Sequence, residues 1–324
     1  GGFLVQVFGW RSIFYVNVPI GILVVSFASL RLREMRTSPI AERFDFAGAA
    51  TLSAALASFL VALTLGGSYG WGSIPILTLL LLTGGAFLLF LYVEGRLSRY
   101  PTFDLSLFTR NRLFAAANTA ALLNYTAISG VTLMISIYLQ DVQGLQPESA
   151  GLFLVAMSVA MALLSPFSGW LSDRFGSRML STLGMLIVTI GLLLMSQLNL
   201  ASSAADIISR LTLLGIGFGL FSSPNTRAVM GSVDRNKLGV ASGTLSTMRS
   251  TGQSIGLAMV GAVIATALPP QVVLQLFTGF TVQSSVARDD FIIGMRNLFL
   301  IASTICAVGT LASLVRGRES TVRQ

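Results

Sequence analysis

Most of this chain consists of long apolar runs separated by short polar stretches, and this pattern constrains its fold more than any motif. A run of about 20 apolar residues is long enough to cross the hydrocarbon core of a bilayer as a helix. Lipid offers no hydrogen-bond partner to free backbone groups, so such runs are expected to be helical. The pattern therefore predicts an all-α polytopic membrane protein with about nine complete transmembrane helices. These spans lie at residues 12–30, 44–65, 74–93, 113–139, 150–170, 179–198, 207–223, 240–268 and 291–315.

The composition supports this class and excludes several others. Apolar residues make up 53% of the chain and charged residues 10%, and the mean hydropathy is +0.78, a balance that does not suit a solvated globule. The chain has no histidine and one cysteine, Cys306, which we expect to pack as a small apolar residue. We therefore expect no metal site, no cofactor and no disulfide within the chain. No Walker-type phosphate loop is present, and the arginines are scattered rather than clustered, so neither ATP nor nucleic acid is an expected partner.

The basic residues predict how the chain is oriented in the membrane. Basic loops alternate with loops at residues 68–73, 141–149 and 199–206, which hold no Lys or Arg. The residues of the basic loops and the tail are Arg31, Arg33, Arg36, Arg43, Arg96, Arg99, Arg110, Arg112, Arg174, Arg178, Arg227, Arg235, Lys237, Arg316, Arg318 and Arg323. Of the loop residues, only Arg11 and Arg288 fall on the other side. Since basic loops stay in the cytoplasm, we expect a multi-pass protein of the cell inner (plasma) membrane with a cytoplasmic carboxy terminus.

Two of the expected spans are separated by one charged turn, Gly169-Trp-Leu-Ser-Asp173-Arg174-Phe-Gly176-Ser-Arg178. Asp173 is placed to cap the second helix, and the glycines allow close helix approach and a tight reversal. The turn resembles the Gly-x-Leu-x-Asp-Arg-x-Gly-x-Arg loop of the major facilitator superfamily of secondary transporters. It departs from that loop at Ser177, where the family usually carries a basic residue.

Further motifs resemble the fourteen-helix drug:proton antiporter branch of that superfamily. Residues similar to the start of its sixth helix are Trp10, Arg11, Phe14, Asn17, Pro19 and Gly21. Other matching residues are Asp45, Gly48, Glu94, Arg96, Pro101, Leu107, Phe108, Tyr138, Gln140, Gly144, Pro147 and Gly151. Gly1 and Gly2 correspond to the last glycines of the antiporter motif in helix five. Because the chain opens within an apolar stretch, we expect it to be the carboxy-terminal part of a longer one.

The resemblance implies a domain organisation and a mechanism. Residues 1–30 correspond to the end of an amino-terminal bundle, 31–112 to two extra linking helices with their loops, 113–315 to a six-helix carboxy-terminal bundle, and 316–324 to a cytoplasmic tail. The implied activity is export of drugs or other small lipophilic or cationic compounds by alternating access, powered by the proton gradient. No acidic residue falls in the middle of a span, so we expect the proton-carrying carboxylate in preceding helices. Periplasmic or outer-membrane partner proteins stay an open question.

The charged turn contains the candidates for a conformational latch, which are Gly169, Asp173, Arg174, Gly176 and Arg178. Ion pairs between a carboxylate and arginines at the cytoplasmic ends of helices hold one access state and break in the other. The alternative interpretation is that these charges only cap helices and set the orientation of the chain.

Arg210 lies one turn inside a span, four residues after Asp206. A charge inside a span indicates function, so we expect an i,i+4 ion pair between the two and a role in gating or coupling. A snorkelling arginine that merely neutralises Asp206 is the alternative. We expect Arg249 and Arg296 to snorkel.

Polar side chains in mid-span mark the inward side of each helix, because contact with lipid would cost free energy. The candidates for lining a substrate cavity are Asn118, Asn124, Tyr125 and Gln253, with Asn225 and Thr251 beside them. Hydrogen bonding between helices, without substrate contact, is the alternative. The glycine patterns at residues 215–219 and 252–256 predict close helix packing.

Three functions are compatible with these features. The first is an exporter of drugs or small amphiphiles, which would confer antibiotic resistance. The second is a transporter of one metabolite, such as a siderophore or an antibiotic made by the host. The third is a membrane scaffold or sensor that does not transport. An enzyme is not expected, because no nucleophile, base and orienting group recur at plausible spacing.

Overall fold

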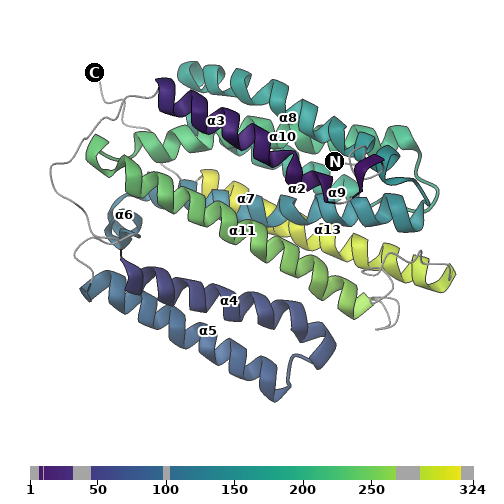
Figure 1. The fold of residues 1–324 in the computed structure, drawn as a ribbon, viewed down its shortest axis with the longest axis horizontal. Coiled ribbons are helices and arrows are strands. Elements are labelled where there is room, and N and C mark those ends of the chain that lie inside the picture. The colour runs from purple at the N-terminus through teal and green to yellow at the C-terminus, as the bar shows by residue number, and fades with distance from the viewer. Residues whose placement is uncertain (1–6, 10, 32–44, 98–102, 268–284, 315–324) are drawn as a thin grey trace.

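The computed structural model describes residues 7–9, 11–31, 45–97, 103–267 and 285–314. In these ranges all regular elements are helical (Figure 1), which confirms the predicted all-α fold. Eight of the helices are long and apolar enough to cross a membrane. Some residues singled out above lie outside the described ranges, namely Gly1, Gly2, Trp10, Arg33, Arg36, Arg43, Arg99, Pro101, Arg316, Arg318 and Arg323.

The eight long helices occupy the places of eight expected spans. The first two are α4 (Phe46–Tyr69) and α5 (Ile74–Tyr92), and α5 continues into a π-helical turn, η1 (Val93–Leu97). The other six are α7 (Arg112–Ile137), α8 (Pro147–Phe175), α9 (Ser177–Met195), α10 (Ala204–Gly231), α11 (Leu238–Ala267) and α13 (Ser285–Leu314). Short elements flank them, namely α6 (Leu105–Arg110), the π-helical turn η2 (Tyr138–Val142) and the 3-10 turn η3 (Arg235–Lys237).

The ninth expected span, at residues 12–30, is interrupted and short. It consists of two helices, α2 (Ser12–Tyr15) and α3 (Asn17–Arg31). Pro19 explains the turn at Val16, because proline has no N–H to donate to the carbonyl group of Tyr15 one turn earlier. The apolar part, Asn17–Leu30, is shorter than the other eight helices. The expected span is therefore corrected to one short apolar helix with a separate first turn.

The six helices from α7 to α13 form a bundle. α10 packs against α8 and α9, α7 packs against α11 and α13, and α9 packs against α13. The core between them includes the fully buried side chains of Met134, Met185, Leu192, Phe221 and Phe299. Only 11% of the apolar window of α8 is buried, compared with 61% for α7. α8 therefore presents most of its apolar surface outside the bundle.

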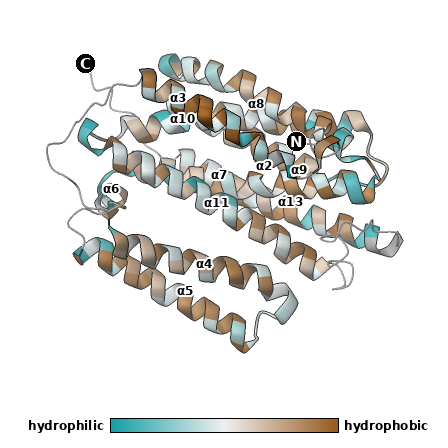
Figure 2. Ribbon diagram, viewed as in Figure 1, coloured by the Kyte–Doolittle hydropathy of each residue, from teal (hydrophilic) through white to brown (hydrophobic). Residues whose placement is uncertain are grey.

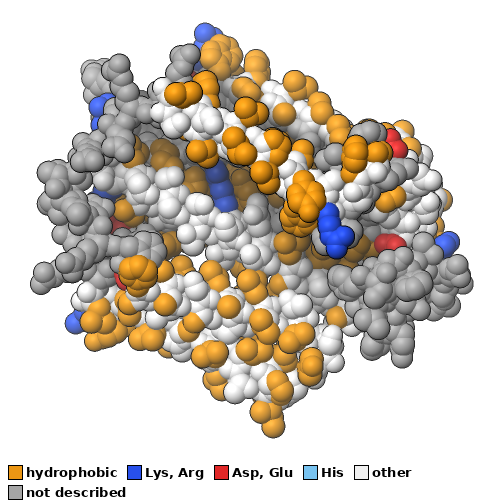
Figure 3. All heavy atoms as spheres, viewed as in Figure 1, with side chains coloured by type: hydrophobic (Ala, Val, Ile, Leu, Met, Phe, Trp, Pro, Cys, Tyr) orange, Lys and Arg blue, Asp and Glu red, His pale blue; other side chains and the backbone are white. Residues whose placement is uncertain are grey.

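The linking pair α4 and α5 lies beside this bundle, at the bottom of the view in Figure 1. The two helices pack against each other, and α4 also packs against α11. A hydrogen bond of 2.9 Å between the hydroxyl groups of Ser58 and Thr83 joins them. Figure 3 shows apolar side chains spread over the visible face of α4 and α5. This surface suits contact with lipid tails.

Successive long helices run in opposite directions, so their connections alternate between the two ends of the molecule. We name one of these the hinge end, where α5, α8, α10 and α13 finish and α4, α7, α9 and α11 begin. The described basic residues gathered there are Arg96, Arg110, Arg112, Arg174, Arg178, Arg227, Arg235 and Lys237. Figure 2 shows hydrophilic residues concentrated near helix ends, whereas α3, α4 and α5 are largely hydrophobic along their length.

Glycines set the distance between helices in the bundle, as the two glycine patterns predict. A Cβ atom on Gly217 of α10 would lie 2.8 Å from the backbone nitrogen of Val188 and 2.9 Å from the carbonyl oxygen of Gly184, both on α9. A Cβ atom on Gly252 of α11 would lie 2.5 Å from the carbonyl oxygen of Leu122 on α7. Both helix pairs therefore meet backbone to backbone, which small residues allow in membranes.

Substitution of Gly217 by valine should loosen the contact between α9 and α10. The added methyl groups would collide with backbone rather than with flexible side chains, and overpacking of this kind costs about 1–3 kcal/mol. We expect a lower melting temperature of the purified protein in detergent. Gly84→Val is the matched control, because a Cβ atom at Gly84 meets no atom within 4 Å. Equal melting temperatures for the two variants would contradict backbone contact at Gly217.

Candidate functional site

The charged turn at the hinge end is held by an ion pair that joins α8 to α10. Asp173, in the last turn of α8, pairs with Nη1 of Arg227, near the end of α10. The same nitrogen lies 3.5 Å from the hydroxyl group of Ser172. Both charged side chains are about half exposed, at 61% for Asp173 and 49% for Arg227. An ion pair this exposed contributes less than about 1 kcal/mol to stability, so it can break without unfolding the bundle.

Asp173 does not cap α9, contrary to the expectation from sequence. The residue before α9 is Gly176, and no side chain caps the helix there. Asp173 still belongs to α8 and faces its neighbour α10 instead. The partner, Arg227, was assigned from sequence only to a basic loop, because α8 and α10 are not consecutive and sequence does not show which helices are neighbours.

Of the other latch candidates, Arg178 connects a further helix to this end, whereas the others act within α8 or at its contacts with α9 and α10. The guanidinium group of Arg174 lies 4.3 Å from the ring centroid of Trp170, a cation–π contact within α8. Arg178, at the start of α9, donates a hydrogen bond to the carbonyl oxygen of Leu314, the last residue of α13. Gly176 has φ of +83°, a conformation that favours glycine. A Cβ atom on Gly169 would lie 2.8 Å from the Ser223 hydroxyl, so glycine permits the close contact between α8 and α10.

Ser177 is fully buried at the start of α9, where the related loop usually carries a base. A charged side chain is rarely buried without a partner. The serine is therefore consistent with the tight turn between α8 and α9.

Asp206 and Arg210 do not form the expected ion pair. The carboxylate of Asp206 accepts hydrogen bonds from the backbone N–H and the hydroxyl of Ser203, and so closes a capping box at the start of α10. Arg210 instead donates a 2.6 Å hydrogen bond to the carbonyl oxygen of Leu194 near the end of α9. Asp206 caps the helix rather than pairing with Arg210, because capping satisfies backbone groups at the start of α10 that would otherwise have no partner. The contact of Arg210 connects α9 to α10 at the end opposite the hinge end.

The two candidate asparagines of α7 are buried in the bundle. Asn118 donates a 3.0 Å hydrogen bond to the carbonyl oxygen of Phe114 in its own helix. Asn124 faces α13, where its amide nitrogen lies 4.0 Å from the sulfur of Cys306. Cys306 is fully buried, as expected for a small apolar residue. These contacts favour packing between helices as the role of Asn124.

Arg249 is a site residue that the sequence interpretation assigned to snorkelling. It lies about three helical turns after Leu238, the first residue of α11. Its guanidinium group lies 5.4 Å from the ring centroid of Tyr125 on α7 and donates a hydrogen bond to the hydroxyl of Thr226 on α10. Its Nε atom is buried and has no hydrogen-bond partner.

Tyr125 connects Arg249 to an aromatic neighbour, which supports Tyr125 as a candidate for lining a substrate cavity. Its ring meets that of Phe218 on α10 edge to face, with the centroids 5.3 Å apart. Gln253 is exposed one helical turn after Arg249 on the same face of α11. Tyr125, Phe218, Thr226, Arg249 and Gln253 therefore form one polar and aromatic group, which we name the Arg249 cluster. It offers a fixed positive charge, aromatic faces and neutral hydrogen-bonding groups.

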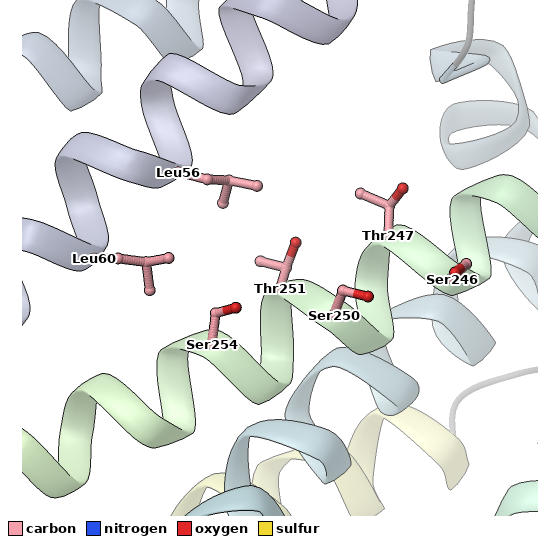
Figure 4. A pocket seen from close by; sticks show the side chains of 7 residues that line it. All are labelled: Leu56, Leu60, Ser246, Thr247, Ser250, Thr251 and Ser254. Atoms are coloured by element: carbon pink, nitrogen blue, oxygen red, sulfur yellow. The ribbon is translucent and has the colours of Figure 1, made fainter. Parts of the chain in front are cut away.

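Thr251 lies on another side of α11 and does not join this cluster. It lines a cleft of about 250 Å³ between α4 and α11. Figure 4 shows Leu56 and Leu60 of α4 facing a row of hydroxyl side chains on α11, namely Ser246, Thr247, Ser250, Thr251 and Ser254. Residues 251 and 253 are two apart and so point to different sides of a helix.

Known proteins of similar sequence are transporters. The chain is 32% identical to the multidrug resistance protein Stp of Mycobacterium tuberculosis, over 96% of this chain and 64% of that protein. It is 31% identical to the multidrug transporter protein MdtP of Bacillus subtilis, over 82% of this chain and 48% of MdtP. It is 28% identical to the riboflavin transporter RibZ of Clostridioides difficile, over 99% of this chain and 66% of RibZ. The chain spans less than two thirds of Stp, at 64% of its length.

The fold is similar to that of a solved transporter. A bacterial homolog of the human lysosomal transporter Spinster, in an inward-facing and occupied conformation, superposes with a TM-score of 0.54 at 14% identity. The superposition covers 84% of this chain and 65% of that one. A sequence model described as Major Facilitator Superfamily matches residues 1–257 and 117–323. With a family match over nearly its whole length and a helical bundle of the same type, the chain belongs to the major facilitator superfamily.

Proposed function

We propose that the protein exports drugs or other small amphiphiles across the inner (plasma) membrane by alternating access, driven by inward proton flow. The observation that carries this proposal is the Asp173–Arg227 ion pair between α8 and α10. Similarity to Stp and MdtP, which are named for multidrug resistance and multidrug transport, supports the substrate class. The hinge end then faces the cytoplasm, in agreement with its basic residues. Residues 113–315 serve as the carboxy-terminal bundle and residues 31–112 as the linking helices.

Prolines near the ion pair give both helices a place to bend. Pro166 lies inside α8, seven residues before Asp173, and Pro224 lies inside α10, three residues before Arg227. A proline in a helix interior removes one backbone hydrogen bond and favours a kink. The last turns of α8 and α10 can therefore tilt relative to the rest of the bundle. We infer that the ion pair holds these turns together in one access state and separates in the other.

Membership in a transporter family also agrees with the expectation that the protein is not an enzyme. Substrate would bind between the carboxy-terminal bundle and the preceding helices, near the middle of the membrane. In this bundle the Arg249 cluster is the best-equipped surface for that contact, because it combines charge, aromatic rings and neutral polar groups.

A second candidate function is transport of one specific metabolite. The Nε atom of Arg249, which is buried without a hydrogen-bond partner, favours it, because a cation with an unsatisfied donor attracts an anionic group rather than a lipophilic cation. The ring of Tyr125, over which the guanidinium group of Arg249 lies, adds a flat surface that suits an aromatic substrate. The relative RibZ is named a riboflavin transporter, so the family neighbourhood includes such specialised proteins.

Removal of either charge of the latch should reduce transport. We expect Asp173→Asn and Arg227→Gln each to lower ethidium-dependent proton flux in inverted vesicles up to about fivefold, as loss of up to about 1 kcal/mol of state-specific stabilisation would. The exchanged double variant, Asp173→Arg with Arg227→Asp, should recover part of the flux, because the pair can form again.

Asp234→Asn is the control for this experiment, since Asp234 is an exposed carboxylate just after α10. Its flux should equal that of the wild type. Normal flux in both single latch variants, with normal protein levels, would show that the pair is not a latch. Loss of flux without recovery in the exchanged variant would indicate separate roles for the two residues.

Substitution of Arg249 should distinguish between the two substrate classes. We expect Arg249→Gln to lower proton flux driven by carboxyfluorescein, an anionic aromatic probe, about tenfold or more, as loss of one charge-assisted hydrogen bond would. Ethidium-driven flux should stay constant or rise, because a repelling charge is removed. Arg249→Lys keeps the charge and should retain part of the anionic activity. Equal loss with both probes would show that Arg249 acts in packing.

A further inference from the structure

Two carboxyl groups lie close together at the hinge end, away from the Arg249 cluster. Asp45 caps the start of α4, and its Oδ1 accepts a 2.8 Å hydrogen bond from the backbone N–H of Gly48. Glu94 lies in the π-helical turn η1 after α5, and its Oε1 accepts a 3.2 Å hydrogen bond from the backbone N–H of Phe103. Each carboxyl group therefore has one oxygen atom engaged with backbone.

Gly48 brings the two groups together. A Cβ atom at this position would lie 2.7 Å from Oε1 of Glu94 and 2.8 Å from Oδ2 of Asp45. Both oxygen atoms thus approach the same point above the backbone of α4, in space that only glycine leaves open. Alanine at this position would push the two groups apart.

The oxygen atoms that do not bind backbone are buried without a partner. Oδ2 of Asp45 and Oε2 of Glu94 are both inaccessible to solvent and accept no hydrogen bond. The Glu94 residue as a whole is only 6% exposed. Phe103, whose backbone N–H binds Glu94, is itself buried, and its ring lies 5.9 Å from that of the buried Phe90. Two ionised carboxylates this close, away from water, would be strongly unfavourable.

The charged groups around the pair do not neutralise it. Asp104, at the start of α6, is a third acid, and Nζ of Lys237 binds it at 2.9 Å. Burial raises the pKa of Asp104, but the hydrogen bonds from Lys237 and Ser106 outweigh this and hold the pKa below its usual value. The positive charge of Lys237 is thus committed to Asp104. Arg96 and Arg110 are exposed, and no described basic residue forms an ion pair with Asp45 or Glu94.

We propose that Asp45 and Glu94 form a proton-binding site that holds one proton between their carboxyl groups. A proton taken from solvent converts two facing negative charges into one carboxylic acid that donates a hydrogen bond to the remaining carboxylate. This satisfies buried oxygen atoms that otherwise have no partner. A metal cation is a poorer occupant, because hard cations take six or more oxygen ligands, and the described residues hold no group of three or more His, Cys, Asp or Glu side chains suited to a metal.

The site joins the linking helices to the bundle. Phe103, which donates to Glu94, begins an aromatic row in which its ring stacks on Phe108 at 5.0 Å, and Phe108 meets Phe114 of α7 at 5.2 Å. Loss of the proton would force Asp45 and Glu94 apart and move Phe103. Protonation therefore stabilises the docking of α4 and α5 on the bundle. The site lies outside the Arg249 cluster, so it is independent of which substrate the protein carries.

The test is the pH dependence of the folded protein and of its carboxyl groups. Infrared spectra of the purified full-length protein at neutral pH should show a protonated carboxyl band that disappears in Glu94→Gln. The folded protein binds this proton more tightly than the unfolded chain does, so stability should fall as pH rises. We expect the wild-type melting temperature to fall from mildly acidic to mildly alkaline pH, and this fall to be much smaller in Glu94→Gln.

Two further variants keep the test decisive. Glu148→Gln, at an exposed acid in the first turn of α8, is the matched control. It should keep both the protonated carboxyl band and the decrease of the melting temperature with rising pH. Asp45→Asn retains a good helix cap and removes the charge that faces Glu94. The carboxyl band of Glu94 should therefore disappear at a lower pH in this variant than in the wild type. A band that persists in Glu94→Gln, or a fall in melting temperature that Glu94→Gln does not reduce, would overturn the proposal. Sodium, potassium or magnesium salts that stabilise the wild type but not Glu94→Gln at alkaline pH would also overturn it.

Discussion

Direct backbone contact at glycines is the constraint on which this structure depends. Inside a bilayer, burial from water does not drive helices together, so association relies on close packing and polar contacts. Gly217 brings α10 against α9, and Gly252 brings α11 against α7. Because α10 also packs against α8 and α7 also packs against α13, these two helices are the central members of the bundle. Two of the proposed site residues, Arg227 on α10 and Arg249 on α11, therefore stand on helices whose spacing those glycines determine.

The fold was largely predictable from sequence, because a bilayer permits few alternatives to a helix for each long apolar run. Eight spans appear close to their expected places, and the glycine patterns act in packing as expected. The exception is the region of Pro19, where one missing N–H separates α2 from α3. Apolar character alone did not reveal that interruption.

The site was less predictable, because its contacts join helices that are distant in sequence. The charged turn was visible in the sequence, but Arg227 as the partner of Asp173 depends on the adjacency of α8 and α10. The surroundings of Arg249 depend on helix adjacency in the same way, since it contacts Tyr125 on α7 and Thr226 on α10. The partner of Asp206 was wrongly predicted, because its spacing along the helix suggested Arg210. Its carboxylate instead caps the start of α10, and Arg210 binds the carbonyl oxygen of Leu194.

The connection between α8 and α9 has a mechanical consequence. Gly176 alone separates the two helices, and Arg178 binds the carbonyl oxygen that ends α13. A linker of one residue cannot lengthen, so α8 cannot slide along its own axis without pulling α9 and, through Arg178, the end of α13. Axial displacement is therefore shared among three helices, whereas rotation about Gly176 disturbs only the turn itself. The bundle is thus stiff against piston motion and compliant toward tilting at this end.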